Sequence, residues 1–573
     1  MTPTALYRWL ARVAPVDGQR DPDLDRALAF LGVDLDSETV TAAATGTATL
    51  TVLLSLGAMV VLPGLAGRVG GLLAVAGAAL AYAVYRAPRW LATARRTRAL
   101  GDATDLVGRA VLQMRLSPTS ERAAAFAARR GAGPLAASLR EHRRRARGTP
   151  RSGWRGFADE WADWNADLRR AVRLVTAAAD ARPGDRSRLL DRALAVVLDG
   201  TRDRMAAFAA AIKGPTSGIY AFGVVLPLAL VSVLPAARAA GLPVGVRFVV
   251  AAYDVVLPGV LVAAAGWLLG RRPAAFPPAP VSRSHPDVPD RRATTAVLGP
   301  AAALAAWLVV GSVGPDWLRW VVAPGTGVGA ALVWWYRPVA RVRERVAAVE
   351  DGLTDALAVV GQRLREGAAT ETAVAAAADE LGGPAAATFA EAARVQRQLR
   401  VGVREAFLGD HGALRTVPSP RVRTIVDLVA LAGREGAHGG RLLVELADHV
   451  DDLLAVEREA RRDLASVTGT LRSTALVFAP LVAGTTVSLA GRLRPDALGD
   501  STGFASGTTS LPVGVLGVAV GVYVLLLAVV LAALAVGLER GLDRSLVGYH
   551  VGVALLSTSV TYPAAVVASG MLV

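Results

Sequence analysis

Long apolar blocks, separated by arginine-rich segments, are the feature that most constrains how this chain can fold. About 20 consecutive apolar residues are enough to cross the roughly 30 Å hydrocarbon core of a bilayer. The mean hydropathy of +0.41 and the charged fraction of 19% are also too apolar for an ordinary soluble protein. The sequence therefore predicts an all-α polytopic membrane protein with eight or nine transmembrane helices. The nine blocks are 46 to 67, 69 to 85, 218 to 237, 248 to 270, 296 to 314, 318 to 336, 473 to 491, 511 to 538 and 546 to 572.

The start of the chain does not read as a cleavable signal peptide. Acidic residues, among them Asp17, Asp21 and Asp25, occupy the first 45 residues, where a signal peptide would carry a basic start and an apolar run. The first spanning block is therefore the expected insertion signal. Because the chain has no cysteine, disulfides, thiolate metal sites and cysteine nucleophiles are excluded together.

The distribution of arginine predicts the orientation, since short arginine-rich loops stay on the cytoplasmic side during insertion. With the N-terminus inside, six of the 63 basic residues fall in outer segments and the remaining 57 lie inside. We expect a multi-pass protein of the cytoplasmic membrane with its N-terminus in the cytoplasm. Topology and attraction to anionic lipid explain most of the net charge of +15, and nucleic-acid binding is not needed. The six outer residues are Arg68, Arg238, Arg247, Arg319, Arg492 and Arg494.

Two charged, alanine-rich stretches interrupt the apolar pattern and have apolar residues at three- and four-residue spacing, which predicts helices. A shift of 250 residues aligns them without a gap, and positions 103 to 139 then contain 12 identities in 37, half of them alanine. A shift of 253 aligns Pro227-Leu228 with Pro480-Leu481. Such self-similarity predicts a duplicated unit, with both copies parallel. The aligned motif positions are Thr104, Asp105, Gly133 and Pro134 with Thr354, Asp355, Gly383 and Pro384.

The repeat divides the chain into eight parts. Each Gly-Pro step is expected to turn a helical hairpin, and Trp154, Phe157, Trp161, Trp164 and Leu168 are expected on one face of a helix in a bundle core. The expected parts are a cytoplasmic N-terminal helical region (1–45), a transmembrane pair (46–85), a first cytoplasmic helical domain (86–215), a second pair (216–270), a cytoplasmic Pro/Arg-rich linker (271–295), a third pair (296–336), a second cytoplasmic domain (337–472) and C-terminal transmembrane helices (473–573).

We find no motif for enzyme chemistry, and we predict no catalytic residue, cofactor or metal site. No G-x-x-x-x-G-K-[S/T] loop is present to hold a nucleotide phosphate. Glu445 and His449 are one helical turn apart, but a solvated acidic face explains them better than a metal. Gly325, Gly327 and Gly329 lie in an apolar block and are expected to pack helices. Apart from Arg319 at the edge of its block, Asp254 and His550 are the charged or titratable candidates within the membrane blocks, and this small number disfavours a transporter without excluding one.

A run of arginines is the most prominent exposed feature. It has two interpretations: a solvated basic loop near anionic lipid, or a docking surface for an acidic protein partner. Few aromatic residues lie nearby, which argues against nucleic acid as the ligand. The run consists of Arg140, Arg143, Arg144, Arg145, Arg147 and Arg151.

The two domains resemble the platform proteins of type IV pilus, archaellum and type II secretion machines, a family that includes the Tad-type branch. The resemblance rests on the paired Thr-Asp and Gly-Pro motifs and on the proline-containing membrane helix that follows each domain. Gly433, Glu435 and Gly436 resemble the glycine-glutamate-glycine element of that family, although here Arg434 is inserted within it. The nearly equal domains and extra membrane helices are most similar to archaeal members.

This resemblance implies a non-enzymatic scaffold. Its expected partners are a separate hexameric assembly ATPase, which the arginine run would bind, pilin-like subunits and the lipid membrane, with no nucleic acid. Whether one copy or a homodimer assembles stays open. The alternative is a polytopic transporter or permease component, for which Asp254 is the candidate residue.

Overall fold

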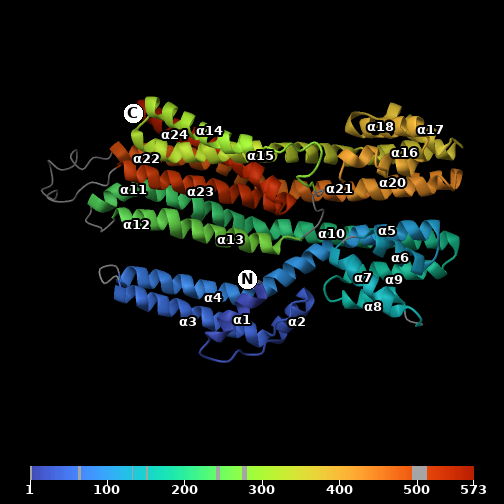
Figure 1. Cartoon of the computed structure of the whole chain (residues 1–573), viewed down its shortest axis with the longest axis horizontal. Coiled ribbons are helices and arrows are strands. Elements are labelled where there is room, and N and C mark those ends of the chain that lie inside the picture. Colours follow the sequence, from blue (N-terminus) through green and yellow to red (C-terminus); the bar gives the residue numbers. More distant parts are fainter. Residues whose placement is uncertain are drawn as a thin grey trace. The chain divides into compact units, whose positions relative to one another are not determined.

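The computed structural model describes residues 3–61, 66–131, 133–149, 152–239, 245–273, 281–492 and 513–572. These residues form helices joined by turns and contain no strand, so the all-α prediction is confirmed (Figure 1). Two compact units, Met1–Gly101 and Asp102–Val573, make up the chain.

The N-terminal unit folds around a small apolar core. Leu24, Leu28 and Val40 are buried together. Asp21 caps the second helix by accepting hydrogen bonds from two backbone N–H groups, and its other carboxylate oxygen accepts one from the Tyr85 hydroxyl at 2.9 Å. This contact ties the short helices to the last helix of the unit. The helices are α1 (Pro3–Arg12), α2 (Pro22–Leu31), α3 (Ser37–Val61) and α4 (Ala66–Gly101).

Two helical bundles in the larger unit each contain six α-helices, and the second also has a 3₁₀ turn. The first helix of one bundle begins at Ala103 and that of the other at Leu353, 250 residues later. The first bundle contains α5 (Ala103–Leu116), α6 (Ser120–Arg130), α7 (Gly133–Ala146), α8 (Gly153–Glu160), α9 (Ala166–Asp180) and α10 (Pro183–Tyr220). The second contains α16 (Leu353–Arg365), α17 (Thr370–Glu380), α18 (Gly383–Leu399), α19 (Val403–Leu408), the 3₁₀ turn η4 (Ala413–Thr416), α20 (Pro420–Ala432) and α21 (Ala437–Ser473).

The aromatic stripe of the first bundle does not lie on a single helix as predicted. α8 ends at Glu160, and α9 begins only at Ala166 because Asn165 caps it, accepting the backbone N–H of Leu168 at 3.0 Å. Trp154, Phe157, Trp161 and Leu168 are buried, as a bundle core requires, whereas Trp164 sits in the turn and is 51% exposed. The sequence did not predict this helix break, because the spacing of three and four residues continues across it.

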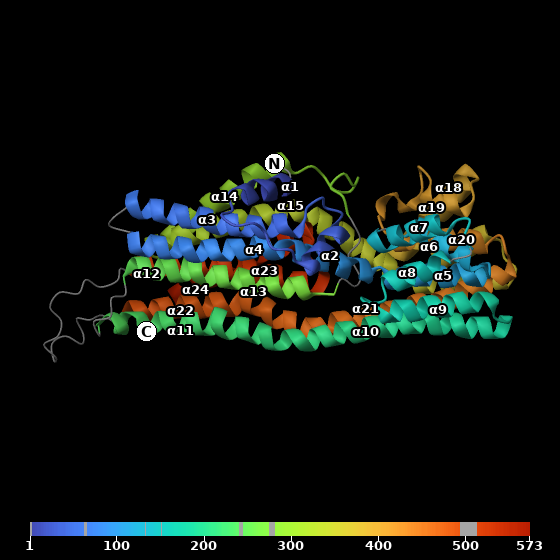
Figure 2. The ribbon, with the colours of Figure 1, turned by 90° about the horizontal axis from the view of Figure 1, so that it is seen from below.

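Each bundle leads directly into a long helix with a π-helical turn. α10 continues through η1 (Ala221–Val225) into α11 (Leu226–Ala239), and α21 continues through η5 (Thr474–Phe478) into α22 (Ala479–Arg492). α10 contacts α21, and α11 contacts α22, so the two long helices run side by side (Figure 2).

A proline follows each π-helical turn, at Pro227 and at Pro480. Proline has no N–H, so the carbonyl four residues earlier lacks its usual helical donor. These carbonyls belong to Gly223 and Leu476. The Tyr523 hydroxyl donates to the Gly223 carbonyl, and the Ser557 hydroxyl donates to the Leu476 carbonyl at 2.7 Å. Both irregular turns are thus stabilised by hydroxyl groups from the C-terminal membrane helices.

Six described helices are long and apolar enough to span a membrane, which supports the predicted membrane protein but not the count of nine spans. Block 46 to 67 falls in α3 and extends partly outside the described residues, block 69 to 85 falls in α4, and block 318 to 336 falls almost entirely in α15. None of the three is among the six. The six are Pro183–Leu234, Val246–Arg271, Arg292–Val313, Ala437–Gly491, Val513–Arg540 and Arg544–Met571. The elements not yet named are α12 (Val246–Val250), the π-helix η2 (Ala251–Val256), α13 (Leu257–Arg271), α14 (Arg292–Val313), the 3₁₀ turn η3 (Asp316–Leu318), α15 (Arg319–Asp351), α23 (Val513–Arg540) and α24 (Arg544–Leu572).

The glycines of α15 allow close helix packing, as predicted. A Cβ atom at Gly327 would lie 2.9 Å from the carbonyl oxygen of Gly299 on α14. One at Gly329 would lie 3.0 Å from the carbonyl oxygen of Gly552 on α24. Larger side chains would push these helices apart.

Candidate functional site

The predicted arginine run lies on α7 and the turn after it, and its charge is partly compensated there. Arg144 forms an ion pair with Glu141, and Arg145 Nε lies 2.9 Å from the other oxygen of the same carboxylate. Arg143 is only partly exposed, because its backbone packs against Gly153, and burial lowers the pKa of its guanidinium. Arg140 and Arg147 are exposed and make no ion pair with a described residue, whereas Arg151 lies outside the described residues.

The paired Gly-Pro motifs take the same conformation in both bundles. Gly133 and Gly383 have φ values of +81° and +67°, in the left-handed region that favours glycine, and begin α7 and α18. Pro134 and Pro384 follow in the first helical turn, where a missing N–H removes no helical hydrogen bond.

The Thr-Asp pairs also lie at matching places, in the first turns of α5 and α16. In the first bundle the buried Thr104 hydroxyl lies 3.3 Å from the Thr201 hydroxyl. In the second, the Thr354 hydroxyl is buried and has no hydrogen-bond partner among the described residues. Asp105 lies 3.6 Å from Arg109, whereas Asp355 makes no ion pair within the described part of the chain.

The Gly433 to Gly436 element forms the tight turn between α20 and α21. Gly436 has a φ of +56°, and a Cβ at Gly433 would lie 2.3 Å from the Thr370 hydroxyl oxygen. Glu435 is exposed. Conformation explains the glycine at Gly436, and packing explains the one at Gly433.

The acidic stretch around His449 contacts the first bundle. Arg115, whose side chain is 9% exposed, forms ion pairs with both Asp191 of its own bundle and Glu445 of the other. Arg130 Nη1 of α6 also lies 2.8 Å from Asp427 of α20. Glu445 and His449 therefore belong to a contact between the bundles.

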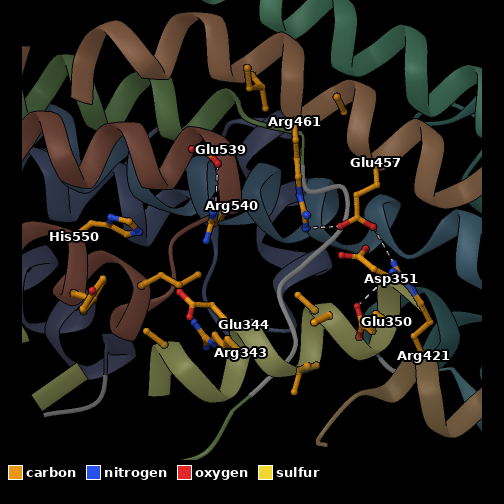
Figure 3. A pocket seen from close by; sticks show the side chains of 18 of the residues that line it. Arg343, Glu344, Glu350, Asp351, Arg421, Glu457, Arg461, Glu539, Arg540 and His550 are labelled. Atoms are coloured by element: carbon orange, nitrogen blue, oxygen red, sulfur yellow. Dashed lines mark hydrogen bonds and ion pairs between the residues drawn. The ribbon is translucent and has the colours of Figure 1, made fainter. Parts of the chain in front are cut away.

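A charged cavity of about 410 Å³, which the sequence did not predict, opens where the second bundle meets the membrane helices (Figure 3). Its walls come from α10, α15, α20, α21, α23 and α24, with Arg272 from the end of α13. Five arginines and five carboxylates line it, so the charges nearly balance. They are Arg272, Arg343, Arg421, Arg461, Arg540, Glu344, Glu350, Asp351, Glu457 and Glu539.

Arg421 is the central cation of this cavity. Its guanidinium lies 3.4 Å from Glu350 and 3.2 Å from Glu457 (Figure 3). Glu457 also accepts a hydrogen bond from Arg461 at 2.5 Å, and Glu350 one from the Ser419 hydroxyl. Burial raises the pKa of the Glu350 carboxyl, although Arg421 and Ser419 oppose that shift. Helices α15, α20 and α21 are joined by this network.

The membrane side of the cavity is held by two further arginines. Arg343 donates two hydrogen bonds of 2.7 Å to the Asp543 carboxylate. Burial acts to raise the pKa of Asp543, but the bonds from Arg343 and Ser545 outweigh it and hold that pKa well below its usual range. Arg272 Nε donates to the Leu538 carbonyl at 2.7 Å, and burial lowers the pKa of its guanidinium to about 10.

The cavity is thus a structural joint that couples the second bundle to α23 and α24. Its ionisable side chains are mostly occupied with one another, and none forms a nucleophile and base pair. Among the described residues, no three His, Asp or Glu side chains stand close enough to hold a metal ion. In the sequence, several charged residues lie at 539 to 544 between two apolar blocks. Such charges normally flank membrane helices, so they do not by themselves indicate a cavity.

No family model, curated protein or solved structure matches this chain.

Proposed function

We propose that this chain is the membrane platform of a filament assembly machine of the type IV pilus, archaellum or type II secretion kind. In this role it is not an enzyme, but couples a hexameric cytoplasmic ATPase to pilin-like subunits in the membrane. The observation that carries the proposal is the pair of long helices, 52 residues in Pro183–Leu234 and 55 in Ala437–Gly491. At 1.5 Å per residue each is about 80 Å long.

These helices suit mechanical coupling. Each is continuous from a helical bundle into a segment apolar enough to span a membrane, so a displacement of the bundle moves the membrane end as well. The charged cavity around Arg421 adds a second connection, between the second bundle and α23 and α24. Nothing in the arrangement requires the chain to hydrolyse a nucleotide, which fits a part that a separate motor moves.

The proposal includes a parallel duplication, with both bundles in the cytoplasm and about nine membrane spans. The duplication is supported by the spacing of the π-helical turns and of the prolines that follow them. The π-helices begin at Ala221 and Thr474, 253 residues apart, and Pro227 and Pro480 have the same separation. Because π-helical turns are rare and often functional, their recurrence at one offset favours a duplicated joint.

The arginine run of α7 is the proposed docking surface for the ATPase. Arg140 and Arg147 are the best residues to test, because they are exposed and make no ion pair with a described residue. In low salt, reversing both to glutamate is expected to reduce co-purification of the full chain with its assembly ATPase at least tenfold. Reversing Arg170 and Arg173, exposed on α9, controls for the change of net charge. Equal retention by both double variants would rule out this surface.

A transporter or permease component is the alternative, favoured by one observation. The Oδ1 atom of Asp254, in the π-helix η2 of a candidate span, is buried without a hydrogen-bond partner among the described residues. A substrate-dependent flux in vesicles that is lost in Asp254→Asn would support transport. A platform would show no such flux.

A further inference from the structure

We infer that the two long helices form a binding site for one anionic phospholipid. The site consists of a polar cleft of about 290 Å³ and an apolar groove of about 350 Å³, and the two share Tyr220. The inference depends only on the membrane placement of these helices, not on the platform role.

The polar cleft offers hydrogen-bond donors that are not used within the protein. Lys213, the single lysine of the chain, is exposed and makes no ion pair with any described residue. The hydroxyls of Tyr220 and Thr470 also have no hydrogen-bond partner in the described part of the chain. An ammonium and two hydroxyl donors facing one cleft are the chemistry that binds a phosphate group. The other lining residues are Thr216, Ser217, Ser466, Val467 and Leu471.

The apolar groove continues from this cleft, between α11 and α22 with their π-helical turns. It exists because the two long helices lie side by side. Both helices line it with residues 253 positions apart, namely Val225 and Phe478, and Ala229 and Val482. Val225, Phe478 and Val482 are 48%, 55% and 42% exposed, so no described helix covers the groove. An acyl chain has the shape and polarity to fill it.

The depth of Lys213 fits a phospholipid headgroup. The apolar block starts at Gly218, five residues later, so Lys213 lies about 7 Å beyond it along the helix. The headgroup layer is about 5 to 7 Å thick on each side of the hydrocarbon core. Tyr220 lies at the boundary, where membrane proteins commonly place tyrosine. Basic pockets between membrane helices on the cytoplasmic side favour anionic headgroups.

The test is native mass spectrometry of the full-length protein in detergent, titrated with phosphatidylglycerol or phosphatidylcholine. The native chain is expected to retain one phosphatidylglycerol in preference to phosphatidylcholine. Lys213→Gln is expected to weaken phosphatidylglycerol retention about fivefold, to the level of phosphatidylcholine, and Lys213→Arg to preserve it. Ala229→Trp, which fills the groove, is expected to reduce the retention of both lipids.

Arg271→Gln is the matched control, since it removes one exposed cation at the end of another membrane helix. An equal loss in Lys213→Gln and Arg271→Gln would overturn the site, as would equal retention of the two lipids by the native chain. Displacement of phosphatidylglycerol by millimolar inorganic phosphate, with no effect of Ala229→Trp, would assign the cleft to free phosphate and overturn a lipid. None of these outcomes depends on filament assembly, so the failure of this site and of the proposed function are distinguishable.

Discussion

The two bundles contain the same ion pair with opposite polarity. In the first, Arg204 of α10 lies 3.1 Å from Asp167 of α9. In the second, Arg421 of α20 lies 3.2 Å from Glu457 of α21. The positions correspond, since Arg421 follows Asp167 by 254 residues and Glu457 follows Arg204 by 253. Opposite charges thus meet at this contact in both bundles, with the cation on different helices.

The surroundings of the two pairs differ. The side chains of Arg204 and Asp167 are 38% and 28% exposed, whereas that of Glu457 is 8% exposed and Glu350 adds a second carboxylate. The caps also differ: Asn165 begins α9 and Ser419 begins α20, but only Ser419 also binds a carboxylate, that of Glu350. We therefore expect loss of the cation to cost more stability in the more buried second pair.

Removing the cation from each pair is expected to give the largest difference. Arg421→Gln leaves Glu350 buried without a cation and is expected to cost about 3 kcal/mol of unfolding free energy. Arg204→Gln exposes its partner to water and is expected to cost about 0.5 to 1 kcal/mol. Thermal unfolding of the full chain in detergent measures both. Equal shifts would contradict the comparison.

The same pair allows a test of polarity in the first bundle. The double variant Asp167→Arg with Arg204→Glu installs the order of charges found in the second bundle. It is expected to recover to within about 0.5 kcal/mol of the native chain, while each single reversal is destabilising. Failure of the double variant to recover would show that the two contacts are not interchangeable.

The next expected effect is smaller and concerns how the stability of the first bundle depends on pH. Burial raises the pKa of Asp102 to about 6, with Asp105 adding to the shift and Arg109 opposing it. Because folding raises this pKa, protonated Asp102 contributes to the stability of the fold. The contribution is complete below about pH 4 and is lost as the pH rises through about 6. The position 250 residues later is Gly352, which does not titrate.

Asp102→Asn is therefore expected to stabilise the full chain at pH 7.5 by about 1 kcal/mol, after allowance for solvent screening, and to have little effect at pH 4.5. Unfolding midpoints at both pH values give the measurement, with Asp355→Asn as the exposed control. A gain that is equal at both pH values would assign the effect to helix propensity instead.

The smallest expected effect concerns the matched threonines. Thr104→Val removes one partner of the buried contact with Thr201 and is expected to cost about 1 kcal/mol. Thr354→Val removes a hydroxyl that has no partner within the described residues, so it is expected to be neutral or slightly stabilising. The position equivalent to Thr201 is Leu454, 253 residues later, which explains why Thr354 lacks a partner. Equal costs for both variants would contradict this account.

Several features of the fold could be predicted from the sequence because they depend on local chemistry. Apolar blocks predicted membrane helices, and Gly-Pro at 133 and 383 predicted turns between helices, where both glycines have a left-handed conformation. The helix break at Asn165 was missed, because the aromatic spacing is the same in one helix as in two short ones. The arginine run is visible in the sequence, and the structure adds that Glu141 partly compensates its charge.

The sequence by itself determined that this chain is helical and apolar enough to enter a membrane, since hydropathy and helical periodicity act over a few turns. Only the tertiary structure brought Glu350, Arg421 and Glu457 together, because they come from three helices separated by up to 107 positions. It also placed Lys213 beside Thr470 in one cleft. Side chains so distant along the chain meet only when packing fixes the register of their helices, and no local pattern encodes that register.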